Sequence, residues 1–147
     1  MLHTIHNDQL TVTIDDQGAQ LQSITAANGT EYLWNGDSAY WGGRAPNLFP
    51  YVGRLTNDTY TYDGKSYQMG RHGFSRHEQF EVRSQGPDKI VLQITSNDKT
   101  LAVYPWNFAF SVSYELDGST VYITYGVVPS EIMEVANEMS RRSRFFI

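Results

Sequence analysis

The chain has 147 residues, enough for one domain and short of two. Eleven Lys and Arg residues against 16 Asp and Glu residues give a net charge of −5, which disfavours nucleic acid as the partner. The absence of cysteine excludes disulfides, zinc–thiolate sites, iron–sulfur clusters and a cysteine nucleophile. No apolar run approaches the roughly 18 residues of a membrane span, and the N-terminal residues are too polar for a signal peptide. We therefore expect a cytoplasmic protein that acts away from membranes.

Alternation of apolar and polar residues predicts β-strands along most of the chain. The expected strands cover residues 9–15, 19–26, 89–95, 108–116 and 120–125. Asn28-Gly29, Asp63-Gly64 and Asp117-Gly118 are two-residue turn signals, so residues 59–69 are expected to form a hairpin. Short strands with turns at this spacing indicate an all-β protein, an antiparallel β-sandwich or a barrel.

Two stretches depart from the alternation. Residues 40–56 are rich in Gly, Pro and aromatic residues, and long irregular loops in a compact domain are more often functional than accidental. In residues 129–147 the apolar side chains Ile132, Val135, Ala136 and Met139 follow helical spacing, which predicts a short helix at the end of the chain.

Three basic residues and one imidazole are candidates for a binding site. Arg54 follows the Gly- and Pro-rich loop and could present its guanidinium to hydroxyls or to an anion, although composition alone favours an ordinary surface Arg at the start of a strand. His72 precedes Gly73, a pattern that can hold an imidazole beside a ligand or merely in a turn. Arg71 and Arg76 flank His72. This basic cluster fits a neutral or anionic small molecule, and it also fits a solvated loop.

Other polar and aromatic residues carry weaker signals. His3 and His6 lack acidic or cysteine companions at metal-ligand spacing, so we expect a solvated strand and no metal site. The adjacent carboxylates of Asp15 and Asp16 are expected to be solvated at a turn. The three tryptophans could stack on sugar faces or pack in loops; they are Trp34, Trp41 and Trp106.

The order of three segments resembles one enzyme family. The segments are A-P-N-L-F-P-Y-V-G-R-L at 45–55, Y-x-Y-D-G-K-x-Y at 60–67 and H-G-F-S-R at 72–76. With Y-P-W-N-F-A-F-S-V-S-Y-E-L at 104–116, they resemble the aldose 1-epimerases, or galactose mutarotases, in their LacX-like branch. The resemblance covers residues 1–128 and implies a large antiparallel β-sandwich, the galactose mutarotase-like supersandwich, present here in its N-terminal part. It leaves residues 129–147 as a divergent tail.

The resemblance implies an activity and a set of contacts. The family interconverts the α and β anomers of a free aldose, without metal or organic cofactor, using an acid and a base to open and close the ring. Arg54 and His72 match positions that contact sugar oxygens, and Arg76 matches a position that helps to bind phosphorylated sugars. The family's catalytic His and Glu have no counterpart here: residues 129–147 contain no His, and no Glu lies in the expected context. We therefore assign no catalytic residue.

The sequence thus predicts an aldose 1-epimerase family protein, with impaired catalysis, whose partner is a hexose or a hexose phosphate. A carbohydrate-binding β-sandwich without turnover and an inactive truncated product remain as alternatives. The loss of both alternation and resemblance near residue 129 suggests the hypothesis of a frameshift or truncation. Because an incomplete sandwich leaves strand edges and apolar faces uncovered, self-association is also expected.

Overall fold

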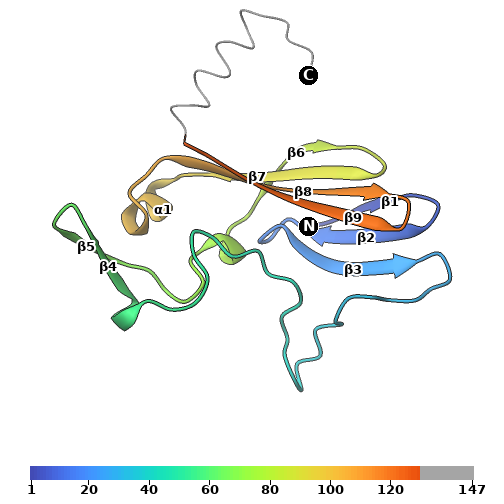
Figure 1. Ribbon diagram of the computed structural model, residues 1–147, viewed down its shortest axis with the longest axis horizontal. Helices are drawn as coiled ribbons and strands as arrows, with labels where there is room; N and C mark the ends of the chain where they lie inside the picture. Colours follow the sequence, from blue (N-terminus) through green and yellow to red (C-terminus); the bar gives the residue numbers. More distant parts are fainter. Residues whose placement is uncertain (130–147) are drawn as a thin grey trace, which may run out of the picture.

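The computed structural model describes residues 1–129, which form two antiparallel sheets and a separate hairpin. The first sheet has the order β1 (Leu2–His6), β2 (Leu10–Asp15) and β3 (Gln20–Ala26). The second has the order β6 (Glu81–Gln85), β7 (Lys89–Thr95), β8 (Phe108–Asp117) and β9 (Thr120–Pro129). Figure 1 shows the two sheets lying one above the other, and hairpin β4–β5 (Thr59–Tyr62 and Lys65–Gln68) standing away from both. The predicted antiparallel β-sandwich is confirmed.

The core lies between the two sheets and is built by the alternation seen in the sequence. On β2, every second residue is buried while its neighbours face outward. The same pattern on β7 and β8 supplies the opposite wall. The buried side chains that meet between the sheets include Ile5, Val12, Ile14, Ile90, Leu92, Val112 and Tyr114. Burial of this apolar surface holds the sheets together, because each strand can hide only one of its faces against the other sheet.

Two of the three predicted turns join paired strands. Asp63 and Gly64 both have positive φ, and the strands around them pair from Tyr62 with Lys65 onward. The β8–β9 connection has only Gly118 and Ser119 between the paired residues. Asn28-Gly29 also forms a turn, but it leads into an isolated bridge between Thr25 and Glu31 rather than into a strand.

Short helices connect the strands. Helix α1 (Asp98–Val103) begins at Asn97, whose side chain accepts from the backbone N–H groups of Lys99 and Thr100, while the Thr100 hydroxyl accepts from the Asn97 N–H. Two 3-10 turns, Thr56–Asp58 and Ser75–His77, lie in the loops that flank the hairpin. None of the helices among residues 1–129 is long and apolar enough to cross a membrane. Pro129, expected to begin the divergent tail, ends β9, and the helix expected after it lies outside the described residues.

Candidate functional site

Two loops meet at Phe49 and Gly73, and this junction positions the site. The first loop connects β3 to β4, and the second connects β5 to β6. The Phe49 carbonyl accepts from the backbone N–H of Phe74 at 2.9 Å and of Ser75 at 3.3 Å. The Phe49 ring stacks on Phe110 of β8, with ring centroids 4.6 Å apart. Gly73 has a φ of 69°, and a Cβ there would lie 2.1 Å from the Phe49 oxygen. The junction therefore requires glycine at this position, for both backbone conformation and space.

Asn47 anchors the first loop to both sheets from a buried position. Its amide Nδ2 donates to the carbonyls of Gly18 at 3.0 Å and Ala19 at 2.7 Å, and lies 3.1 Å from the hydroxyl of Tyr114. Its Oδ1 accepts from the hydroxyl of Tyr125 on β9 at 2.9 Å. Burial raises the pKa of the Tyr114 hydroxyl far above its ordinary value, so that phenol stays protonated. The network fixes the backbone on either side of Asn47.

His72 is held on the second loop by a two-way contact with Gly53. The His72 N–H donates to the Gly53 carbonyl at 2.8 Å, and the Gly53 N–H points at His72 Nδ1 at 2.9 Å. His72 has a φ of 69°, a conformation that is costly for a residue with a side chain. The surrounding hydrogen bonds therefore impose this backbone geometry on the imidazole.

The contact with Gly53 determines which ring nitrogen carries the proton. His72 Nε2 also lies 3.1 Å from Nε of Arg71, so both ring nitrogens face an N–H donor. A neutral imidazole has only one lone pair to accept with. The Gly53 N–H is fixed in the backbone, whereas the Arg71 side chain can turn away. We therefore assign the acceptor role to Nδ1 and the proton to Nε2.

A concavity of about 460 Å³ opens beside this imidazole. It is lined by Trp41, Pro46, Leu48, Arg71, His72 and Arg76. Arg76 is oriented by Nη2 donating to the Arg71 carbonyl at 3.2 Å and by Nε lying 3.0 Å from Nε2 of His77. Partial burial lowers the pKa of His72 below its ordinary value, and the charges of Arg71 and Arg76 lower it further. None of the six lining residues is acidic, so the concavity presents two cations and a neutral imidazole.

Arg54 is placed differently from His72 and Arg76. Its Nε and Nη2 donate to the two carboxylate oxygens of Asp58 at 2.9 and 2.8 Å, and it is not among the residues that line the concavity. This pairing raises the pKa of Arg54 and lowers that of Asp58. Because both match positions that contact sugar oxygens, the resemblance predicts that Arg54 and His72 point into one concavity. The structure brings His72 and Arg76 together with Arg71 and Trp41, while the Arg54 side chain turns to its own loop.

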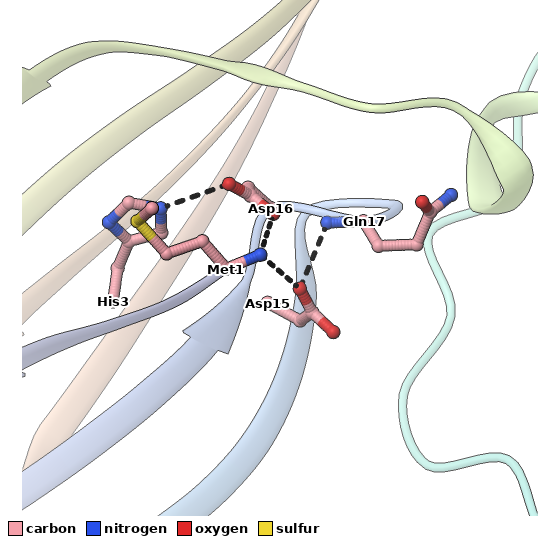
Figure 2. Close-up of polar contacts among 5 residues, drawn as sticks. All are labelled: Met1, His3, Asp15, Asp16 and Gln17. Carbon is pink, nitrogen blue, oxygen red and sulfur yellow. Dashed lines mark hydrogen bonds and ion pairs between the residues drawn. The ribbon is translucent and has the colours of Figure 1, made fainter.

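The turn after β2 holds a second charged cluster around Asp16, none of whose residues lines the concavity (Figure 2). Asp16 Oδ1 accepts from the ammonium of Met1 at 2.5 Å, and Oδ2 lies 3.3 Å from Nε2 of His3. Burial opposes ionisation of Asp16, but hydrogen bonds from the ammonium, Gln79 and His3 outweigh it and lower the pKa to about 2. The expectation that His3 and Asp16 are solvated is wrong: their side chains are 14% and 13% exposed.

The cluster around Asp16 has a structural role. The Asp16 carbonyl accepts from the N–H of Phe80 at 2.9 Å, so the same residue joins the first sheet to the segment that leads into β6. Among residues 1–129, no group of three or more His, Asp or Glu side chains is placed to hold a metal ion. The concavity beside His72 therefore remains the candidate functional site.

Comparison with known proteins places this geometry in a family. A sequence model of the aldose 1-epimerase family matches residues 1–137. The chromosomal and plasmid LacX proteins of Lactococcus lactis subsp. lactis are each 36% identical over 132 residues, which is 86% of this chain and 44% of theirs.

Solved structures give the same result. A galactose mutarotase related enzyme from Lactobacillus acidophilus is 42% identical with a TM-score of 0.86, over 88% of this chain and 43% of that one. A galactose mutarotase-like protein from Lactobacillus casei is 32% identical with a TM-score of 0.85, over 88% of this chain and 44% of that one. The chain thus spans less than half the length of these relatives. It belongs to the aldose 1-epimerase family.

Proposed function

We propose that this chain binds an aldose that carries an anionic group, such as an aldose phosphate, in the concavity beside His72. One observation carries the proposal: the polar side chains that line the concavity are all hydrogen-bond donors. A guanidinium has five N–H groups and no acceptor, and the one lone pair of His72 is occupied by the Gly53 N–H. A ligand rich in acceptors satisfies such a surface, and a phosphate or carboxylate also matches its charge.

The remaining lining residues suit the rest of a sugar. Trp41 exposes about half of its surface, and the indole face can pack on the C–H groups of a pyranose ring. Pro46 and Leu48 add apolar surface, and the buried amide of Asn47 between them fixes their backbone. The predicted contact of Arg54 with a sugar oxygen stays part of the proposal. It requires the Arg54 guanidinium to exchange the Asp58 carboxylate for the ligand.

We further propose that this chain, acting alone, binds its ligand without interconverting the anomers. Ring opening requires a base at the anomeric hydroxyl and an acid at the ring oxygen. Within residues 1–129, the concavity has no carboxylate in its lining, and His72 has no free lone pair to act as a base. Its Nε2–H can donate a hydrogen bond to a sugar oxygen, which orients a ligand but supplies only half of the required proton transfer.

Isothermal titration calorimetry can test the binding proposal, with glucose 6-phosphate, glucose and inorganic phosphate as ligands at one fixed ionic strength. We expect glucose 6-phosphate to bind more tightly than either of the other two, because it alone engages both the arginines and the tryptophan. Arg76→Gln should weaken its binding by about 10- to 100-fold, the equivalent of one charge-assisted hydrogen bond of about 1.5–3 kcal/mol. Arg83→Gln is the matched control, since Arg83 lies on β6 and does not line the concavity.

Equal affinities for glucose and glucose 6-phosphate, or equal losses in Arg76→Gln and Arg83→Gln, would contradict the anionic ligand. Polarimetry on fresh α-D-glucose and α-D-glucose 6-phosphate tests the second statement. We expect the rate of mutarotation to equal that of the buffer. A faster rate that disappears in His72→Asn would show that the chain is catalytic after all; Asn is chosen because it tolerates a positive φ.

A further inference from the structure

The first part of the loop between β3 and β4 carries exposed aromatic side chains and reaches the concavity. We call residues 32–44 the aromatic loop. Both of its ends are tied to β3, by a hydrogen bond from the Tyr32 N–H at one end and by a bridge at Ala45 just after the other. Between these ends the chain projects away from both sheets (Figure 1). The exposed aromatic residues of the loop are Tyr32, Trp34, Tyr40 and Trp41. Of these, only Trp41 lines the concavity.

Hydrogen bonds within the aromatic loop fix the backbone of Trp41. The Trp41 N–H donates to the Asp37 carbonyl at 2.8 Å, and the Trp41 carbonyl accepts from the indole Nε1 of Trp34, also at 2.8 Å. The Trp34 ring in turn packs edge-on against Tyr40, with ring centroids 6.3 Å apart. These contacts determine where the Trp41 backbone lies, but they do not determine which way its indole turns.

The backbone of Gly43 provides the surface on which the Trp41 indole lies. A Cβ at position 43 would lie 2.6 Å from Cζ2 of Trp41, 2.7 Å from Cε2 and 3.0 Å from Nε1, all closer than ordinary van der Waals contact. The φ of Gly43 lies outside the left-handed region, so backbone conformation does not require glycine there. The space that the indole occupies is therefore the physical reason for glycine at this position.

The preceding residue, Gly42, gives a matched comparison. Its φ also lies outside the left-handed region, and a Cβ there would meet only Ser38, with its nearest atom at 3.9 Å. Replacement by Ala restricts the unfolded chain in the same way at the two positions. Gly42 and Gly43 thus differ in one respect that matters here, which is contact with the Trp41 indole.

We propose that Gly43 is a positioning residue of the binding site: by leaving room for the Trp41 indole, it makes the concavity select a sugar phosphate over inorganic phosphate. This role rests on the function proposed above, in which the ligand is an aldose with an anionic group. Both ligands present phosphate oxygens to Arg71 and Arg76, but only the sugar phosphate has a C–H face that an indole can cover. A side chain at position 43 would displace the indole, so the loss should fall on the sugar and spare the phosphate.

Isothermal titration calorimetry at one fixed ionic strength tests this role, with glucose 6-phosphate and inorganic phosphate as ligands. We expect Gly43→Ala to weaken binding of glucose 6-phosphate by about threefold to tenfold, the contribution of one well-placed aromatic contact. Binding of inorganic phosphate should change by less than about twofold, and Gly42→Ala should change neither affinity by more than that. In the Trp41→Ala background, Gly43→Ala should have no further effect, because Gly43 acts only through the indole.

A measurement without ligand reports the position of the indole directly. In NOESY spectra of the free protein, the Hζ2 proton of Trp41 should show a cross-peak to an α proton of Gly43, since the ring lies on that backbone. The cross-peak should persist in Gly42→Ala and be lost in Gly43→Ala. Because the clashing atoms belong to a half-exposed side chain and not to backbone, both variants should unfold at urea concentrations close to that of the wild type.

Several results would show that Gly43 does not act in this way. They are equal losses of glucose 6-phosphate binding in Gly42→Ala and Gly43→Ala, an equal loss of both ligands in Gly43→Ala, and a further loss in the Trp41→Ala background. A Gly43→Ala protein that fails to fold, or that keeps the cross-peak, would likewise refute the role. The proposed function fails on a different result, a wild-type protein that binds glucose 6-phosphate no more tightly than inorganic phosphate. A wild-type preference that Gly43→Ala leaves unchanged would refute the positioning role alone.

Discussion

Replacing Asn47 with Ala should cost this protein much of its stability, because the buried amide ties the first loop to both sheets. The substitution removes three contacts of Nδ2 and one of Oδ1. The Ala19 carbonyl keeps the hydroxyl of Tyr114 at 2.7 Å, and the hydroxyl of Tyr125, a residue that is 56% exposed, can bond to water instead. The Gly18 carbonyl has no second donor among the described residues and becomes an unpaired buried acceptor.

These losses set the expected magnitude. An unpaired buried acceptor costs about 1–3 kcal/mol, and each of the other lost hydrogen bonds contributes about 0.5–1.5 kcal/mol. We therefore expect Asn47→Ala to lower the free energy of unfolding by about 3 kcal/mol, a large fraction of the roughly 5–15 kcal/mol typical of a domain. With a urea m-value of about 2 kcal/mol/M, the midpoint of unfolding should fall by about 1.5 M. The fluorescence of the three tryptophans reports the transition.

The control is Asn107→Ala, since Asn107 is exposed and its side chain accepts one bond, from the hydroxyl of Ser96 at 3.1 Å. It should change stability by less than about 0.5 kcal/mol. Tyr125→Phe removes the donor to Asn47 Oδ1, and the double variant with Asn47→Ala should show a coupling of about 1 kcal/mol. If Asn47→Ala destabilises no more than Asn107→Ala, the amide does not anchor the loop and our reasoning about the site's backbone is wrong.

Further predictions concern the loop junction, acid stability and the imidazole. Gly73→Ala should cost more than about 3 kcal/mol or prevent folding, because the new Cβ meets the Phe49 oxygen, whereas Gly64→Ala, with a similar φ of 71° and open space, should cost only about 1–2 kcal/mol; equal urea midpoints would contradict this. The pKa of Asp16 falls from 3.8 to about 2 on folding, so its stabilisation is complete above about pH 4 and is lost as the pH falls toward 2. Asp16→Asn should flatten that part of the acid unfolding curve, and an unchanged slope would refute the assignment. In NMR spectra, His72 should be the Nε2–H tautomer at pH 7 and titrate below 6.5, and an Nδ1–H tautomer would contradict the Gly53 contact.

Strands that bury one face are predicted from their alternation alone, whereas the exposed hairpin β4–β5 is predicted from its Asp63-Gly64 turn. Strand β7 occupies the expected residues 89–95, since its apolar residues alternate and every second one lies in the core. Strand β6 shows no such signal, because all five of its residues are exposed and only pairing with β7 defines it. Helix α1 is not predicted either, because six residues are too few to establish a helical period. Its capping residues, Asn97 and Thr100, are nevertheless recognisable in the sequence.

The site is predictable only in part. His72 and Arg76 line one concavity, but the sequence offers no reason to place Trp41 in the same lining, because Trp41 lies on another loop, 31 residues before His72. Arg54 carries the same motif evidence as His72, yet its side chain pairs with Asp58, four residues away. A motif specifies where the backbone of such a residue lies more firmly than it specifies the rotamer of a long, exposed side chain.

Local sequence is enough to specify which face of each strand turns inward and where the chain reverses, because both depend on neighbours within a few residues. Alternation sets the strand faces, and residues that accept positive φ set the turns. The features on which the site and the burial of β9 depend come from contacts between residues far apart in the chain. Asn47 contacts Tyr114 and Tyr125, which lie 67 and 78 residues further along the chain, and the glycine at position 73 is required by a carbonyl 24 positions earlier. Strand β9 has the alternation of a buried strand, but its burial depends on how far the opposite sheet extends. How far the opposite sheet extends is a property of the assembled sheets, and no local sequence pattern predicts it.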